Sequence, residues 1–297
     1  MPRILITLGD PAGIGPEIVD LALASGRLPP GFEFEILGDR GEGIPGKPDA
    51  RSASSALEAL GEAVARLQDN RADAVVTGPV SKEGLQAIGF PFPGQTEFFA
   101  AAFGVQDYGM LLTGATLSVG LATIHEPLAK VPELLSAERI LRIGLLTVAF
   151  LAKRGIARPR IAVAALNPHA GEHGAFGDEE TRIIRPAIAL LNQQAPGVFS
   201  GPAVPDVVFR EAASGAYDAV IAMYHDQGLI PLKLLDFDTA VNVTLGLPKP
   251  RTSPDHGTAF ALAGKNRAKA ASMIAAIRLA CELVQPRPGI GGVEPVP

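Results

Sequence analysis

The sequence has few of the features that mark secreted, membrane-spanning or disordered chains. It contains one cysteine, Cys281, in 297 residues, so a disulfide within the chain is excluded. Charged residues make up only 19% against 47% hydrophobic residues, which argues against intrinsic disorder. The longest apolar stretch, residues 143–152, is too short to span a bilayer, and the N-terminus lacks a signal-peptide core. We therefore expect a folded cytoplasmic protein with Cys281 packed in its interior.

Several functional signatures are also missing. The net charge of −5, from 26 basic and 31 acidic residues, offers no general attraction to nucleic acid or to an anionic membrane. The Gly-rich loop at residues 9–17 has neither the Gly-Lys-Ser/Thr ending of a P-loop nor a Gly-x-Gly-x-x-Gly fingerprint. There is no His-Glu-x-x-His helix and no Gly-x-Ser-x-Gly elbow. These absences argue against a nucleotide-driven motor, a typical Rossmann site, a zinc protease and a serine hydrolase.

Short β-branched runs alternate with longer helical patterns along the chain. Strands are expected at residues 4–8, 34–37, 74–77, 110–112, 117–123, 160–165, 219–223 and 240–244. Helices are expected at residues 15–24, 54–68, 96–103, 136–154, 178–194, 257–263 and 266–284, followed by a fraying tail. The alternation predicts an α/β fold whose mostly parallel sheet includes one antiparallel hairpin. At about 150 residues per domain, the length predicts two lobes, and we expect them to share a cleft.

Gly/Pro-rich polar loops follow strand after strand. They cover residues 9–17, 77–82, 124–127, 167–172, 224–228 and 242–256. Ligands of open parallel sheets bind beyond the carboxyl ends of the strands, so this pattern favours an enzyme over a structural protein. The first loop enters a helix N-terminus, where it could bind an anion or simply form a tight turn.

All five histidines fall in these loops, and they are His125, His169, His173, His225 and His256. Three of them, His125, His169 and His225, directly follow separate strands and would converge if those strands are neighbours. Three neutral imidazoles suit Zn, Co, Ni or Mn and leave positions open for substrate oxygens. A single loop histidine is more often a hydrogen-bonded surface or packing residue than a metal ligand, and it is the combination of three that favours the metal site. His173 and His256 could support the metal or contact a nucleotide.

Cationic side chains follow the last of these histidines. Lys233 and Arg251 lie 8 and 26 residues beyond His225, with Asn242 between them at a strand end. Lys and Arg beside a metal favour an anionic substrate, such as a carboxylate or a phosphate. The alternative is that they are solvated surface cations, and Lys249 is close enough to Arg251 that one of the two could simply be exposed.

Longer stretches of the sequence together resemble a known family. They are Ile4–Glu17, Thr77–Lys82, Thr96–Phe99, Leu166–Glu172, Ala222–Gly228, Asn242–Pro248 and Arg251–Ala259. Their combination is similar to the 4-hydroxythreonine-4-phosphate dehydrogenase family of pyridoxal phosphate biosynthesis, and the resemblance extends to about Leu283. It implies an isocitrate/isopropylmalate dehydrogenase-like fold with two α/β lobes around a cleft. One lobe would comprise residues 1–100 plus 245–297, with the Gly-rich and nucleotide-binding loops. The other would comprise residues 101–244, with most metal ligands and the dimer contacts.

The resemblance also assigns roles to individual residues. It implies that a divalent ion (Zn, Mg, Mn or Co) is held by His125, His169 and His225, with ligands from both subunits of a homodimer. The substrate contacts carried over are Gln95, Thr96, Lys233, Asn242 and Arg251. The general-base candidates are Lys233 and Asp226. The contacts expected for NAD or NADP are Asp255, His256, Gly257, Thr258 and Gly264, in a loop that differs from the Rossmann fingerprint.

The implied reaction is NAD-dependent, metal-dependent oxidative decarboxylation of 4-(phosphooxy)-L-threonine to 3-amino-2-oxopropyl phosphate and CO2. Two features depart from the family pattern. Gln95 stands where a histidine is usual, and it can donate a hydrogen bond but cannot carry charge. The chain is also short between Asp39 and Ser54. Both departures leave open a dehydrogenase for another anionic hydroxy acid, such as a tetronate 4-phosphate or a carboxylated cis-dihydrodiol. A metal-dependent hydrolase and a non-catalytic metabolite-binding protein are further alternatives.

Overall fold

The computed structural model describes residues 1–285, and the expected fraying tail falls almost wholly on residues 286–297, outside the described part. The described residues form two compact units. Unit 1 comprises residues 1–106 and 241–285, and unit 2 comprises residues 107–240. These bounds differ by a few residues from those expected from the sequence, so that Asn242 belongs to unit 1 rather than to the other unit.

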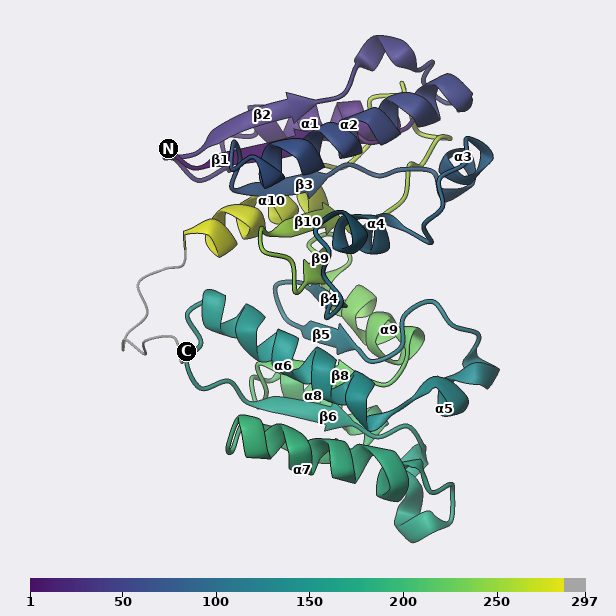
Figure 1. The fold of residues 1–297 in the computed structure, drawn as a ribbon, viewed down its shortest axis with the longest axis vertical. Helices are drawn as coiled ribbons and strands as arrows, with labels where there is room; N and C mark the ends of the chain where they lie inside the picture. Colours follow the sequence, from purple (N-terminus) through teal and green to yellow (C-terminus); the bar gives the residue numbers. More distant parts are fainter. Residues whose placement is uncertain (286–297) are drawn as a thin grey trace. The chain divides into compact units, whose positions relative to one another are not determined.

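In unit 1 the strands lie in the order β2-β1-β3-β10-β9 (Figure 1). Their bounds are β1 Arg3–Thr7, β2 Glu33–Leu37, β3 Ala74–Thr77, β9 Val241–Leu245 and β10 Arg251–Pro254. β1 pairs in parallel with β2 and β3, and β10 pairs in parallel with β3, whereas β9 runs antiparallel to β10. The carboxyl ends of β1, β3 and β10 therefore share one edge of the sheet.

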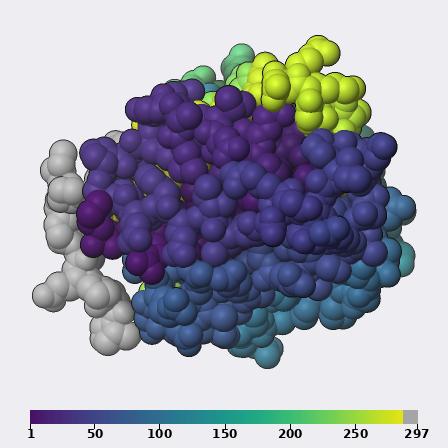
Figure 2. All heavy atoms as spheres, turned by 90° about the horizontal axis from the view of Figure 1, so that it is seen from above, coloured from purple at the N-terminus to yellow at the C-terminus, as the bar shows by residue number. Residues whose placement is uncertain are grey.

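The helices of unit 1 pack on this sheet through apolar stripes. They are α1 Gly15–Ala24, α2 Ala50–Gln68, α3 Lys82–Ala87, α4 Gln95–Ala102 and α10 Ala271–Val284. Helix α2 begins where the Asp49 carboxylate accepts a hydrogen bond from the backbone N–H of Ser52, and its buried residues pack against Leu5 and Val75. Helix α10 packs against α1, β3 and β10. In the space-filling view the yellow C-terminal residues lie against the purple N-terminal ones (Figure 2).

In unit 2 the strands lie in the order β4-β5-β8-β6-β7. Their bounds are β4 Gly109–Thr113, β5 Ser118–Leu121, β6 Ile161–Ala164, β7 Phe199–Ala203 and β8 Ala219–Ala222. The expected antiparallel hairpin is confirmed in β4 and β5, and the other pairs are parallel. Because β5, β8 and β6 are parallel neighbours, the loops that follow them leave the same edge of the sheet.

Helices cover both faces of the unit 2 sheet. They are α5 Val131–Leu134, α6 Ala137–Lys153, α7 Arg185–Gln194, α8 Pro205–Ala213 and α9 His225–Asp236, with a π-helical turn at Glu180–Ile184. Gly120 of β5 faces α6 so closely that a Cβ atom would lie 2.9 Å from Oγ1 of Thr147. Its neighbours Val119 and Leu121 point to the other face and join the core beneath α8 and α9. Among residues 1–285, every helix is too short or too polar to span a bilayer.

The structure corrects the elements expected near the C-terminus and adds several that the sequence patterns do not predict. The helix expected at residues 257–263 is wrong, because this segment is a series of turns with Ala259 in a left-handed conformation. Helix α10 starts at Ala271 rather than at residue 266, since Asn266 also has a positive φ. The sequence patterns do not predict the elements α3, α5, α8, β7, β10 and α9, the last of which contains Pro231. The packing expected for Cys281 is confirmed, and burial raises the pKa of its thiol to about 12.

Candidate functional site

Unit 1 contains a buried guanidinium at the start of β10. Arg251, expected in a loop, is only 3% exposed, and Nε and Nη2 donate to Oγ1 of Thr77 at 3.1 and 2.6 Å. Nη1 donates to Oγ1 of Thr244 at 3.1 Å. Burial lowers the pKa of Arg251 to about 10, although the charge of Glu97 opposes this shift. Because the hydrogen-bond acceptors are neutral, the positive charge of Arg251 remains available to an anion.

The N-terminus of α4 lies beside this guanidinium. Oε1 of Gln95 accepts a hydrogen bond from Nη2 of Arg251 at 3.0 Å, and Nε2 of Gln95 donates to the carbonyl of Gly78 at 3.4 Å. Thr96 is buried, with Oγ1 3.3 Å from Oγ1 of Thr244. The N-cap residue of α4, Gly94, has no side chain to bond the first N–H groups. Gln95, Thr96 and Arg251 therefore form a compact polar cradle at a helix N-terminus, where anions are favoured.

Asn242 extends the cradle along β9. It lies two residues before Thr244, so both side chains point to the same face of the sheet. Oδ1 of Asn242 is buried and has no hydrogen-bond partner among the described residues. A buried acceptor without a partner is rare in a folded protein and is commonly explained by a missing ligand or water. The structure thus places Gln95, Thr96, Asn242 and Arg251 on one part of unit 1.

The segment that follows β10 is tied to the N-terminal loop. The backbone N–H of Ile14 donates to the carbonyl of Thr258 at 2.9 Å, and a Cβ atom on Gly13 would lie 2.8 Å from that carbonyl oxygen. The N–H groups of Ala12 and Gly13 donate to Oδ1 and to the carbonyl of Asp10. These N–H groups are used within the protein, which favours the tight-turn interpretation of the first loop over the anion-binding one.

Two buried polar atoms flank the same segment. Oε1 of Glu17 accepts a hydrogen bond from the N–H of Ala268 at 2.8 Å, while Oε2 is buried and has no partner among residues 1–285. Nδ1 of His256 lies 3.1 Å from the carbonyl of Gly257, and Nε2 is likewise buried and unpartnered within the described chain. Of the other expected cofactor contacts, Asp255 donates its N–H to Oγ of Ser272, and Gly264 has a φ of +72°.

Two of the three expected metal ligands lie together in unit 2. His125 follows β5 and His225 is the first residue of α9, directly after β8, so neither lies far from the shared strand edge. Their ring centroids are 5.4 Å apart with an interplanar angle of 41°. Nδ1 of His225 lies 2.6 Å from Oδ1 of Asp226. This contact leaves Nε2 of His225 as the nitrogen for a metal, since ligating histidines usually bond a carboxylate through their other nitrogen.

His169 does not join this pair within one chain. It follows β6 as expected, but its ring packs 6.1 Å from the ring of Phe176. In the part of the chain that the structure describes, no three His, Cys, Asp or Glu side chains come together to hold a metal ion. His173, proposed above to support a metal or contact a nucleotide, lies exposed in the same loop as His169.

The loop that carries His169 has an unusual backbone. Residues 169–173 all have φ between +39° and +79°, and only Gly171 among them is a glycine. Left-handed residues other than glycine cost roughly 1–2 kcal/mol each, and such strain is typical of functional segments. The buried carboxylate of Glu180 holds the start of the loop, because its Oε1 accepts hydrogen bonds from the N–H groups of Leu166 and Asn167. Sequence reasoning missed Glu180, which gave no signal beyond an acid in the first turn of a helix.

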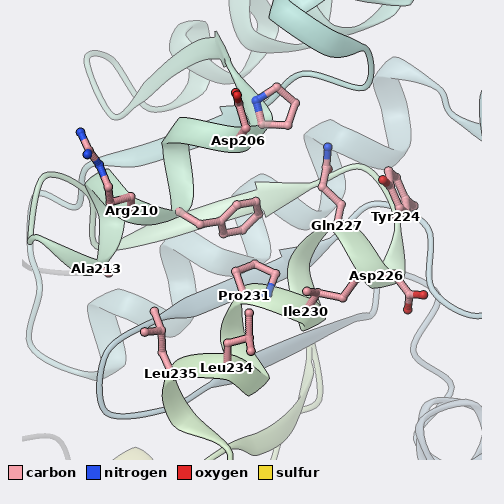
Figure 3. Close-up of a pocket in the computed structure, with 12 residues that line it drawn as sticks. Asp206, Arg210, Ala213, Tyr224, Asp226, Gln227, Ile230, Pro231, Leu234 and Leu235 are labelled. Carbon is pink, nitrogen blue, oxygen red and sulfur yellow. The ribbon is translucent and has the colours of Figure 1, made fainter.

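The remaining expected residues lie along α9. Asp226 contacts His225, as described. Lys233 is eight residues beyond His225, which is roughly 12 Å along the helix axis. The same helix exposes a row of apolar side chains, with Ile230 59%, Leu234 80% and Leu235 53% exposed. These residues border a groove of about 600 Å³ between α8 and α9, lined mainly by apolar side chains with Asp206, Arg210 and Asp226 at its rim (Figure 3).

Comparison with known proteins places this architecture in a family. The family model for the pyridoxal phosphate biosynthetic protein PdxA matches residues 29–280. A 4-hydroxythreonine-4-phosphate dehydrogenase of Geobacter metallireducens is 44% identical, covering 99% of this chain and 98% of the relative. A D-threonate 4-phosphate dehydrogenase of Pectobacterium atrosepticum is 37% identical, covering 94% and 98%.

Solved structures agree with these matches. A crystal structure of 4-hydroxythreonine-4-phosphate dehydrogenase from Klebsiella pneumoniae has a TM-score of 0.80 at 38% identity, covering 96% of this chain and all of that one. Isocitrate dehydrogenase from Methylococcus capsulatus has a TM-score of 0.52 at 17% identity, with 96% and 85% covered, and this likeness concerns the fold alone. The α/β fold of the isocitrate dehydrogenase type is therefore confirmed, and the chain belongs to the PdxA family of pyridoxal phosphate biosynthetic proteins.

Proposed function

We propose that this protein catalyses NAD-dependent oxidative decarboxylation of 4-(phosphooxy)-L-threonine to 3-amino-2-oxopropyl phosphate and CO2. The observation that carries the proposal is the buried Arg251, whose hydrogen-bond partners Thr77, Gln95 and Thr244 are all neutral. A desolvated guanidinium of this kind is suited to a phosphate or carboxylate. Relatives of the chain are named for oxidation of a phosphorylated hydroxy acid of this type.

The substrate would be held by the cradle of unit 1. Arg251 would supply charge, Thr96 and the N-terminus of α4 would donate hydrogen bonds, and the unpartnered Oδ1 of Asn242 would accept one. Gln95 contributes no charge, and its amide is already engaged by Arg251 and Gly78.

A divalent ion fits the donor chemistry of His125 and His225. Two imidazoles on one tetrahedral ion, with metal–nitrogen bonds of about 2 Å, have ring centroids roughly 5 Å apart, close to the separation seen here. When bound, Zn, Mg, Mn or Co would act as a Lewis acid toward the substrate oxygens. Asp226 orients the His225 ring, which favours a supporting role for this carboxylate and leaves Lys233 as the preferred candidate for the base.

NAD or NADP would bind along the segment after β10. Nε2 of His256 and Oε2 of Glu17 are buried polar atoms without partners among residues 1–285, and ribose or amide groups could satisfy both. Thr258 and Gly264 belong to the same tightly held segment. The cofactor would accept the hydride, and the protein would hold it in place.

A second copy of this chain would complete the metal site. His169 of one subunit would join His125 and His225 of the other, since these three do not meet within one chain. The exposed apolar face of α9 favours this homodimer, because α9 begins at His225 and a partner seated on Ile230, Leu234 and Leu235 would lie near the ion. The groove beside α8 would receive part of that partner (Figure 3).

Mixed dimers test the shared site. His169→Ala and His225→Ala should each abolish turnover. In a dimer with one subunit of each variant, one site loses both mutated histidines and the other site keeps all three ligands. Unfolding and refolding the two variants together should therefore restore activity, approaching about a quarter of wild type if subunits pair at random. No recovery in the mixture, with dimers present, would show that each site is built from a single chain.

A substrate panel tests the reaction itself. NADH absorbance should rise with 4-(phosphooxy)-L-threonine and far less with D-threonate 4-phosphate or a carboxylated cis-dihydrodiol. Preference for D-threonate 4-phosphate would assign the chain to the activity named for the Pectobacterium relative. Phosphate release without NAD would instead indicate a metal-dependent hydrolase.

A further inference from the structure

A hydrogen-bonded chain connects the ends of the strands that carry the three histidine loops. The carbonyl of Met223, at the end of β8, accepts hydrogen bonds from Oγ1 of Thr123 at 2.7 Å and from its N–H at 3.2 Å. Thr123 lies two residues before His125, and Met223 lies two residues before His225. Both Thr123 and Met223 are at most 1% exposed, so water does not compete for these bonds.

Gln227 carries the chain across to β6. Its Oε1 accepts a hydrogen bond from the N–H of Met223 at 2.7 Å, and its Nε2 donates to the carbonyl of Ala165 at 2.7 Å. Ala165 immediately follows β6 and lies four residues before His169. One side chain of the first turn of α9 thus joins two neighbouring strand ends, and it needs both an acceptor and a donor to do so.

We propose that Gln227, together with Thr123, is a positioning residue that sets the spacing of the His125, His169 and His225 loops. The inference rests on the proposed metal site and adds residues that touch neither the ion nor the substrate. Metal sites demand ligand placement within a fraction of an ångström, and residues that orient ligands typically change metal affinity about 10–100-fold when replaced. Gln227 bonds the backbone where the loops leave the strands and does not contact the histidine rings. Its replacement should therefore weaken metal binding at both sites of the dimer.

The substitution Gln227→Glu isolates this role. The carboxylate keeps the shape and the acceptor facing the N–H of Met223, but its second oxygen faces the carbonyl of Ala165 and repels it. Asn192→Asp is the matched control, because Nδ2 of Asn192 donates to the carbonyl of Phe199 and Oδ1 accepts from its N–H. Phe199 is the first residue of β7, at the end of the strands opposite to the histidine loops.

Titration of metal-free full-length protein with Co²⁺, followed by its visible absorption, measures the dissociation constant independently of turnover. Gln227→Glu should weaken Co²⁺ binding at least about tenfold relative to wild type. Asn192→Asp should lower the melting temperature to a comparable extent yet bind Co²⁺ with unchanged affinity. Thr123→Val, which removes the hydroxyl donor to Met223 and keeps the side-chain shape, provides a second route if Gln227→Glu does not fold, and it should weaken binding in the same direction.

The outcomes distinguish failure of the metal site from failure of the positioning role of Gln227. A wild-type dimer that does not bind Co²⁺ overturns the proposed metal site, and this inference with it. Wild-type binding combined with unchanged affinity in the folded Gln227→Glu and Thr123→Val variants overturns the positioning role alone. Equal loss of affinity in the Asn192→Asp control also overturns it, because the effect would then follow general stability.

Discussion

The side-chain oxygen of Gln95 lies 3.0 Å from Nη2 of Arg251, and the same amide donates to Gly78. Gln95 is thereby fixed between the guanidinium and the backbone of the loop after β3. Gln95→Leu should raise KM for the phosphorylated substrate about tenfold with a smaller change in kcat, because a hydrogen bond to a charged group contributes roughly 1.5–3 kcal/mol. Gln68→Leu is the control, since Gln68 makes one exposed bond in the same unit. An unchanged KM in Gln95→Leu would contradict the role.

Arg251 should be required for binding but not for folding. Arg251→Met removes a buried charge whose hydrogen-bond partners are neutral, so no hydrogen-bonded ion pair is broken, although the attraction to Glu97 is lost. The free energy of unfolding in urea should change by less than about 1 kcal/mol, because relief of desolvation offsets the lost hydrogen bonds. KM should rise at least about 100-fold. A marked loss of stability with an unchanged KM would show that Arg251 is structural.

The strained loop around His169 allows a test with two glycines. A Cβ atom on Gly171 would lie 2.6 Å from Oε2 of Glu180, and Gly171 has a φ of +79°. Gly174 has a φ of +96°, and among residues 1–285 no atom apart from its own and those of its chain neighbours lies within 4 Å of its Cβ position. Gly174→Ala should lower the free energy of unfolding by about 1 kcal/mol, and Gly171→Ala should lower it further and also weaken metal binding. If Gly171→Ala and Gly174→Ala changed the metal affinity equally, the contact between Gly171 and Glu180 would not be what positions His169.

Burial of Asp10 predicts a pH-dependent stability. Burial raises the pKa of Asp10 above its ordinary value, although the hydrogen bond from the N–H of Ala12 opposes this. The unfolded chain therefore loses this proton at lower pH than the folded one, so the wild type loses stability as pH rises from about 4 through the raised pKa. Asp10→Asn stays neutral and should gain stability relative to wild type over that range.

Urea unfolding at pH 4 and pH 7 measures this gain. Asp39→Asn is the matched control, because Asp39 forms the same turn with the N–H of Gly41 at an exposed position. A gain of equal size in both variants would show that burial of Asp10 is not the cause.

Much of the fold follows from local sequence patterns. The helix at Gly15–Ala24 and the strand at Ala74–Thr77 have the expected bounds, because strong apolar periodicity and flanking turn residues mark both. Helix α9 is not predicted from the sequence, since Gly228 and Pro231 interrupt its pattern, and its packing against β4, β5 and β8 stabilises it. The helix expected at 257–263 fails for the opposite reason, because contacts such as that of Thr258 with Ile14 override a helix-forming composition.

The candidate site was only partly accessible to sequence reasoning. Loop positions after strands identified His125 and His225, and the structure brings these rings together. The burial of Arg251 could not be foreseen, because it depends on pairing of β10 with β3 and β9. The roles of Gln227 and Glu180 could not be foreseen either, since they come from bonds to backbone groups of other elements.

The most direct test of the central claim is the stoichiometry of one reaction mixture. Purified protein with NAD, 4-(phosphooxy)-L-threonine and a divalent metal should form NADH and CO2 in equal amounts. A chelator should stop both, and added metal should restore both. NADH formation that persists after complete removal of metal, or an absence of NADH and CO2 with metal present, would contradict the account.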